Sequence, residues 1–207
     1  MLLMSSSRAE ALTHDGQQWT MLVVQGPTTS NLRTYFEVQP RFASDFSRID
    51  KVIIRPALWY LFDNGVSVWG GYAWQPAFTP TFLNEQRVWQ QVMHEWKVAP
   101  GLTLWNRFRV EERFIQNVPQ AAVRLRHQLR GLARLGGEEC PWHFVWQEEV
   151  FYNPVGTSGN GPRGGFDQNR AFVGLHRVMT PMVKLEAGYL NNFVHTPGPR
   201  DERMNHV

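Results

Sequence analysis

The strongest constraint on the fold is a two-residue alternation of bulky apolar and charged side chains over residues 102–130. Before Pro119, one set of alternate positions holds Leu104, Phe108, Val110 and Phe114, and the other holds Arg107, Arg109, Glu111 and Arg113. After it, the two sets are Val123, Leu125 and Leu129, and Arg124, Arg126, Gln128 and Arg130. A period of two places each set on one face of a β-strand. The stretch therefore predicts two neighbouring strands, each with an apolar and a charged face.

The composition of the charged face indicates which side of the sheet it occupies. A soluble sandwich usually covers its polar face with a mixture of Lys, Thr, Ser and Glu, whereas this face is mostly Arg with some Glu. The chain has eighteen Arg and only three Lys. Arg pairs with carboxylates through a five-donor fork while partly desolvated, and Lys favours open water. We therefore predict enclosed Arg–carboxylate pairs, as in a barrel with lipid outside and a polar lumen.

Length and composition exclude several other classes. A chain of 207 residues suits one domain, and no stretch approaches the roughly eighteen apolar residues of a membrane-spanning helix. The net charge of +3 is small and the Arg residues are spread along strands, which argues against nucleic-acid binding. Cys140 is a lone cysteine, so neither a disulfide framework nor a cysteine metal site is expected. The histidines lack metal-ligand spacing, and no cofactor is predicted: His94, His127, His143 and His176.

The rest of the chain continues the β pattern. Besides the two central runs, strands are expected at residues 19–25, 32–41, 51–62, 66–75, 84–98, 142–153, 167–178 and 182–193. Residues 63–65 (Asp-Asn-Gly) indicate a tight hairpin turn, and residues 154–166 form the longest loop. A helix over residues 85–98 is the alternative for that segment. The fold class predicted is all-β: an up-and-down antiparallel membrane-type β-barrel with about ten visible strands, or ten to twelve when complete.

Both ends of the chain lead to further expectations. Residues 1–17 are expected to be a loose leader or the remnant of a secretory signal, with the barrel domain at 18–207. Residues 204–207 look like the start of another strand, so the barrel is expected to be truncated at its C-terminus. The strand at 182–193 should then have one complete neighbour, or meet residues 19–25 over a short, irregular seam.

Several pieces of the sequence together resemble a bacterial family of outer-membrane β-barrels that is catalogued only as a domain of unknown function. The pieces lie at residues 35–41, 55–58, 71–74, 84–91, 107–114, 124–126, 149–153 and 165–170. They include the motifs Glu-x-Gln-x-Arg, Arg-Pro, Asn-Glu-Gln-Arg-x-Trp-Gln-Gln and Gly-Phe-Asp-Gln-Asn-Arg, and their order covers most of residues 19–207. The resemblance implies a barrel fold and a bacterial outer-membrane location, and it implies no activity.

The candidate site is the set of charged residues expected to line the lumen. They are Glu37, Arg41, Arg55, Glu85, Arg87, Arg107, Arg109, Glu111, Arg113, Arg124, Arg126, Glu149, Arg170 and Glu186. They could form an anion-attracting constriction, because rings of Arg select anions in pores. Alternatively, they could form a structural ladder that fills a narrow lumen. The set has nine bases and five acids, so an open pore should prefer anions.

The predicted function is therefore an outer-membrane barrel that is structural or passes small, preferentially anionic solutes. Its partners would be outer-membrane lipid and possible small anions. The alternative is a soluble, lipocalin-like barrel that binds an apolar ligand; in that case Phe108, Val110 and Leu125 would face inward. A lipid-modifying enzyme is less favoured, because no serine lies in a recognisable nucleophile motif and the Gly-rich residues 156–165 lack a phosphate-loop ending. We expect the protein not to be an enzyme.

Overall fold

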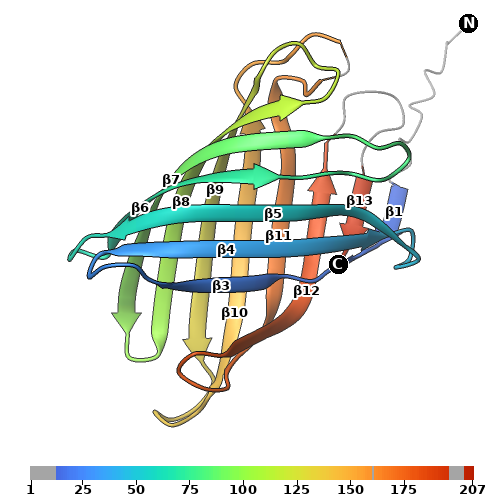
Figure 1. The fold of residues 1–207 in the computed structure, drawn as a ribbon. Helices are drawn as coiled ribbons and strands as arrows, with labels where there is room; N and C mark the ends of the chain where they lie inside the picture. Colours follow the sequence, from blue (N-terminus) through green and yellow to red (C-terminus); the bar gives the residue numbers. More distant parts are fainter. Residues whose placement is uncertain (1–12, 160, 196–202) are drawn as a thin grey trace, which may run out of the picture.

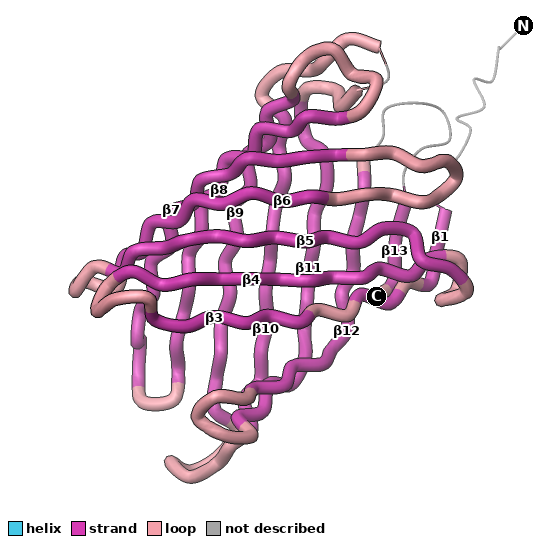
Figure 2. Tube along the Cα trace, viewed as in Figure 1, coloured by secondary structure: helices cyan, strands magenta, loops and turns pink. Residues whose placement is uncertain are grey.

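The structure is a computed structural model and describes residues 13–159, 161–195 and 203–207. Thirteen strand segments in these residues form one sheet that curls into a nearly closed, mostly antiparallel barrel (Figure 1). Strands and loops make up the whole described part of the chain (Figure 2). The all-β barrel predicted from the alternation is confirmed. The helix considered for residues 85–98 is wrong, because these residues belong to a strand.

The strands follow one another around the wall in nearly the order of the sequence. They are β1 (Thr13–Gly16), β2 (Gln18–Trp19), β3 (Leu22–Pro27), β4 (Leu32–Ala43), β5 (Arg48–Leu61), β6 (Val66–Trp74), β7 (Glu85–Ala99), β8 (Leu102–Ile115), β9 (Ala122–Arg134), β10 (Trp142–Asn153), β11 (Gly165–Val178), β12 (Lys184–Val194) and β13 (Arg203–His206). From β4 to β12, each strand pairs antiparallel with the next. The two central runs of the sequence are β8 and β9.

The connections between strands differ at the two ends of the barrel. One end has short turns, at residues 28–31, 62–65, 100–101, 135–141 and 179–183. The turns at Gly65 and Gly101 need a positive φ, and both glycines have φ of 81°. The other end carries longer connections, including residues 75–84 and 154–164. We call them the short-turn end and the long-loop end.

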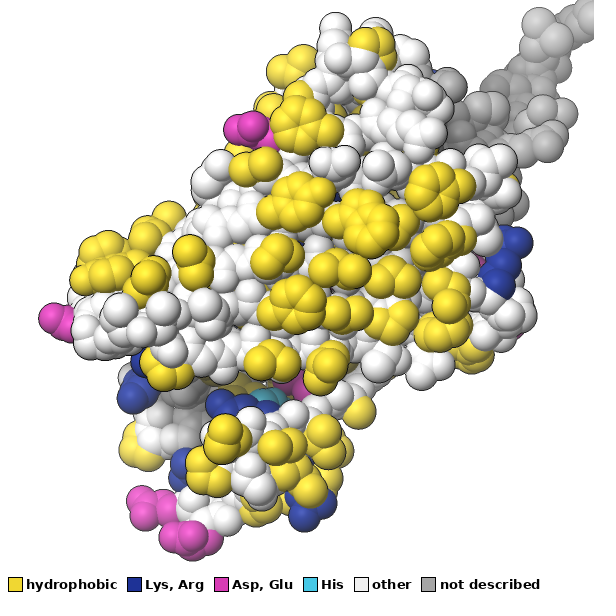
Figure 3. All heavy atoms as spheres, in the orientation of Figure 1, with side chains coloured by type: hydrophobic (Ala, Val, Ile, Leu, Met, Phe, Trp, Pro, Cys, Tyr) yellow, Lys and Arg dark blue, Asp and Glu magenta, His cyan; other side chains and the backbone are white. Residues whose placement is uncertain are grey.

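The wall is incomplete where the two ends of the chain meet. β12 pairs along its whole length with β11 but with β13 over only four residues. β13 in turn pairs in parallel with β1, and the N–H of Gln17 donates to the carbonyl of His206 (2.7 Å). Within the described residues, β3 and β12 share no ladder. As expected, β12 therefore has one complete neighbour, and Figure 3 shows a hollow between the two edges in which basic side chains are visible.

Two details of the predicted strands at the chain ends need correction, and a third, the further strand at residues 204–207, is confirmed. Residues 13–17 are not a loose leader, because 13–16 form β1; its partner is 190 residues away in sequence, so local periodicity gives no sign of it. The leader's residues 1–12 lie outside the described residues. The single strand expected at 19–25 is broken into β2 and β3. β13 matches the further strand expected at 204–207, so the sheet has more segments than the ten expected.

The two faces of the wall have opposite chemistry. Side chains facing the lumen are mostly charged or amide groups and are buried, whereas outward side chains are mostly apolar and more exposed; Glu112 and Glu148 are charged exceptions on the outer face. In β8, Phe108 is 47% exposed, whereas Arg109 is 4% and Glu111 is 1% exposed. A small apolar cluster also lies inside, with Ala57, Ala73 and Trp89 at its centre. Among the described residues, none belongs to a helix long and apolar enough to span a lipid bilayer.

Candidate functional site: the charged lumen

The middle of the lumen is built around two buried carboxylates, Glu111 and Glu149. Arg126 donates to both of them, with nitrogen–oxygen distances of 2.6 Å to Glu111 and 2.7 Å to Glu149. Arg87 contacts Glu111 from the other side at 3.1 Å, and Arg107 pairs with Glu149. These groups come from β7, β8, β9 and β10. The pairs therefore tie four neighbouring strands together across the inside of the wall.

Three more carboxylates extend this network around the wall. Glu85 accepts hydrogen bonds from Arg87 (2.8 Å) and Arg113 (2.5 Å). Glu37 accepts two from Arg55 (2.8 and 2.9 Å) and one from the hydroxyl of Tyr35. Asp167 pairs with Arg124 at 2.9 Å. We call the five acids and the Arg residues around them the charge ladder: Glu37, Glu85, Glu111, Glu149, Asp167, Arg55, Arg87, Arg107, Arg109, Arg113, Arg124 and Arg126.

The charge ladder closes the middle of the lumen to water. Glu37 and Glu149 are each 2% exposed, whereas carboxylates in an open channel would be hydrated. Trp89, at 1% exposure, adds an apolar wedge, and the guanidinium of Arg109 lies over its ring at 4.2 Å. A side chain at Gly71 would collide with Trp89, since its Cβ would lie 2.5 Å from the ring. The lumen is therefore filled at its centre.

At the long-loop end, the lumen widens into a cavity of about 690 Å³, which we call the vestibule. Ten of its lining residues are Arg or Lys, whereas four are acidic. The charge ladder forms its floor. Near its mouth, Arg41 and Arg170 both lie over the ring of Trp19, at 3.6 and 4.8 Å from the ring centroid. Within the described residues, neither Arg is paired with a carboxylate.

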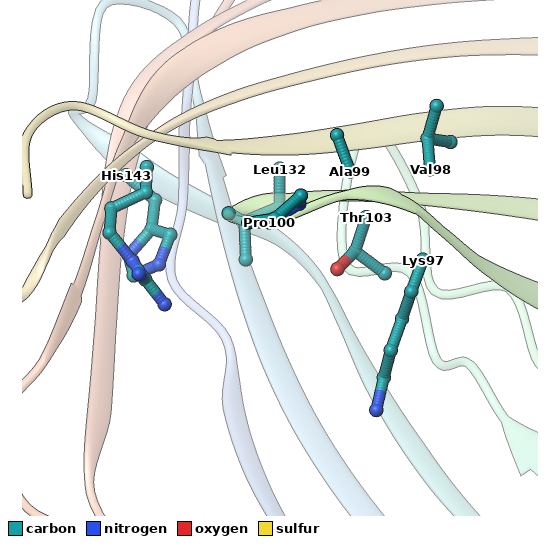
Figure 4. Close-up of a pocket in the computed structure, with 9 residues that line it drawn as sticks. Lys97, Val98, Ala99, Pro100, Thr103, Leu132 and His143 are labelled. Carbon is teal, nitrogen blue, oxygen red and sulfur yellow. The ribbon is translucent and has the colours of Figure 1, made fainter. Parts of the chain in front are cut away.

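The short-turn end has a second cavity of about 570 Å³. Its charged lining residues are Lys97 and Arg134, with His143 beside them, and none of the described residues that line it is an acid. Figure 4 shows Lys97 and Val98 pointing to opposite sides of β7, as the strand alternation requires. Both cavities are therefore basic, and the charge ladder separates them.

The structure places the sequence-predicted charged residues on the lumen side, in two groups. Thirteen belong to the charge ladder or the vestibule. Glu186 does not, because it lies toward the short-turn end and pairs with Arg130 (2.5 Å) and His176 (3.2 Å). Its side chain is 28% exposed, so its inclusion in one continuous ladder is wrong. In the register of β11 and β12, Glu186 is far along the strand from Asn192, which faces Arg170.

Sequence reasoning missed Asp167 because of a β-bulge. Between Phe151 and Tyr152 the pairing of β10 with β11 shifts by one residue, so the backbone of Asp167 has no paired residue on β10. A bulge lets two consecutive residues turn toward the same side. Asp167 and Gln168 consequently both contribute to the lumen, and simple alternation assigns them to opposite faces. Trp19 was missed for a related reason, since it lies in the two-residue strand β2.

The comparison with protein families matches this architecture to a known group of sequences. The family model described as "Protein of unknown function (DUF2490)" matches residues 16–204. The chain belongs to the DUF2490 family. An uncharacterised protein of Methylorubrum extorquens is 29% identical over 211 residues, covering 100% of this chain and 90% of the relative. The matched residues begin at the last residue of β1 and include all of β2, which supports counting β2 with the barrel.

The chemistry available to this DUF2490 protein is set by unequal charge. In the charge ladder, most Arg side chains are paired with carboxylates. In the vestibule, Arg and Lys side chains outnumber the acids. Within the described part of the chain, no group of three or more His, Cys, Asp or Glu side chains could hold a metal ion. Binding of anions, rather than of metal cations, is the chemistry that these side chains favour.

Proposed function

We propose that this protein is an integral outer-membrane β-barrel that is closed at rest and restricts passage to small solutes, preferentially anions. The observation that carries the proposal is the inverted distribution of side chains across the wall. Charges fill the inside, while outward positions around the barrel are mostly apolar, for example Phe36, Leu58, Val92, Phe108 and Val173. Figure 3 shows such side chains gathered across β4, β5 and β6. Soluble monomers rarely expose a continuous apolar surface of this kind.

The direction in which the side chains point also argues against the alternative of a soluble barrel with an apolar ligand. That alternative required Phe108, Val110 and Leu125 to line the interior. Phe108 is instead 47% exposed on the outside, and the inner positions beside it hold Arg109 and Glu111. An apolar ligand would have to displace paired charges from the lumen, at a cost of several kcal/mol for each group left unpaired.

Charge and closure together support the restricted, anion-leaning passage. Basic side chains line the cavities at both ends, so an anion is attracted from either side. The charge ladder between them blocks large solutes. The proposal therefore includes a filled lumen at rest and no large, constant conductance. It includes no enzymatic activity.

Reconstitution of the full chain tests both parts of the proposal. After refolding into lipid vesicles, the protein should float with the vesicles and remain in them after alkaline carbonate extraction. In planar bilayers under a salt gradient, the conductance should be small, with a reversal potential that favours anions. Extraction by carbonate would contradict the membrane assignment, and a cation-selective or large steady conductance would contradict the restricted anion passage.

A further inference from the structure

Arg41 and Arg170 differ from the Arg residues of the charge ladder in how they are held. The Nε and Nη2 atoms of Arg41 donate to the side-chain oxygen of Gln39 at 3.0 and 2.6 Å. Arg170 donates from Nε to Asn192 (3.0 Å) and from Nη2 to Gln168 (3.3 Å). Amide oxygens orient a guanidinium but do not neutralise it. Within the described residues, neither guanidinium is therefore balanced by a carboxylate.

Each of these guanidinium groups has one amino group left for a ligand. Within the described residues, the Nη1 atoms of Arg41 and Arg170 form no hydrogen bond. Neither atom is among the buried nitrogens without a partner, so both are open to the vestibule that these residues line. Arg41 as a whole is only 8% exposed, which means that its charge is largely desolvated.

The ring of Trp19 fixes the two guanidinium groups near one another. The guanidinium carbon of Arg41 lies 3.6 Å and that of Arg170 lies 4.8 Å from the same ring centroid. Arg170 also lies over Phe151 at 4.5 Å. Two like charges held close together in a partly dry cavity repel one another. A multiply charged anion between them would relieve that repulsion and would accept hydrogen bonds from both Nη1 groups.

We propose that the vestibule binds a phosphate-type oxyanion, carried by a small molecule, between Arg41 and Arg170. Arg forks match the geometry of phosphate oxygens, and a charge-assisted hydrogen bond is about twice as strong as a neutral one. The cavity of about 690 Å³ also leaves room for the organic part of the ligand. The inference deepens the proposed function by naming the solute class at its long-loop end. Oxyanion binding is measured separately from conduction, so the binding site and the proposed passage of anions can be refuted independently.

Calorimetric titration of the full chain in a neutral detergent with inorganic pyrophosphate tests the site, with ionic strength held constant by sodium chloride. R41Q and R170Q should each weaken binding roughly 10- to 100-fold, the effect of losing one charge-assisted contact. R33Q is the matched control. Arg33 lies on the same strand as Arg41 and over a Trp ring (Trp59, 5.2 Å), but it does not line the vestibule. Binding by R33Q should stay within about two-fold of binding by the unchanged protein, because the contacts of Arg41 and Arg170 are intact.

Two results would overturn the site. One is unchanged affinity in R41Q and R170Q while both remain folded, as judged by heat-modifiable migration in electrophoresis. The other is an equal loss of affinity in all three variants, which would indicate attraction by net charge alone. A second arm identifies the source of the oxyanion. Pyrophosphate binding is measured in phosphatidylcholine nanodiscs with and without added phosphatidylglycerol. If phosphatidylglycerol weakens binding by the unchanged protein but does not weaken the residual binding by R170Q, the site takes a lipid headgroup. If phosphatidylglycerol does not compete, the site takes a soluble phosphate.

Discussion

In the middle of the lumen Glu111 and Glu149 each meet two or more Arg side chains, whereas in the vestibule Arg41 and Arg170 meet amide oxygens and the ring of Trp19. The same residue type therefore has two roles within one barrel. Where the counter-group is a carboxylate, the Arg joins strands and fills space. Where the counter-group is a neutral amide, the Arg is held in place without a neutralising carboxylate, as the proposed oxyanion site requires. The following substitutions test this difference, beginning with the largest expected effect.

Removing the charge of Glu111 should be the most damaging single change in the charge ladder. Glu111 neutralises Arg126 and Arg87, and Arg109 lies 3.7 Å from it. E111Q leaves these groups buried without their shared anion, and breaking a buried pair costs about 3–5 kcal/mol. Urea unfolding in lipid vesicles measures the loss. E186Q is the control: its pair with Arg130 is partly exposed and should be worth less than about 1 kcal/mol. Equal losses in the two variants would show that the middle of the lumen is hydrated.

A charge on the outer face of the wall should also be costly if that face meets lipid. Phe108 lies near the middle of β8 and points outward. F108R should destabilise the vesicle-inserted barrel by about 2–4 kcal/mol, the cost of Arg near the centre of a bilayer. F46R is the control, because Phe46 is 56% exposed in the turn after β4 and does not lie on the wall. If F108R costs no more than F46R, this face is not embedded in lipid.

The pair of Glu37 and Arg55 should show strong coupling in a double-mutant cycle. Arg55 gives Glu37 two hydrogen bonds, at 2.8 and 2.9 Å, from the neighbouring strand. E37Q and R55Q each leave one buried charge without its partner, whereas the double substitution removes both charges. We expect a coupling free energy of about 1–3 kcal/mol, with the double variant more stable than the sum of the single losses predicts. Additive losses would mean that the pair is already solvated.

In the vestibule, the loss of an Arg charge should change stability least. R170Q removes contacts with Trp19 and Asn192 but also relieves the repulsion between Arg170 and Arg41. The two contributions oppose each other, so the change in unfolding free energy should be at most about 1 kcal/mol. The same urea titration measures it, without added phosphate. A loss as large as that of E111Q would make Arg170 a structural residue and remove the difference between the two regions.

The fold was largely predictable because one physical rule repeats along the chain. Alternation at a period of two gave β8, β9 and most of the other wall strands, and the Arg-rich composition of one parity indicated that it was enclosed. β1 was not predictable, because its four residues are held by a parallel partner at the other end of the chain. No local pattern in residues 13–16 reports a contact of that kind.

The members of the candidate site were predictable, but their division into roles was not. Parity alone places Arg41, Arg126 and Arg170 on the same inner face. Whether each Arg meets a carboxylate depends on the register between neighbouring strands. A shift of one residue in that register changes which side chain the Arg contacts. The bulge that brings Asp167 to Arg124 is such a case. Trp19, which holds the vestibule pair, lies in a strand too short to show any alternation.

The most direct test of the account is to find which medium surrounds the outer wall. In a Cys140→Ser background, single cysteines at Leu58, Val92, Phe108 and Val173 are spin-labelled, with Phe46 as the reference position in a turn. In lipid vesicles, the collision rate of each label with oxygen, which partitions into lipid, is compared with that of a water-soluble nickel complex. Labels at the four wall positions should favour oxygen and the label at Phe46 should favour nickel. If the wall labels favour nickel as Phe46 does, the charged lumen belongs to a barrel that does not span a membrane.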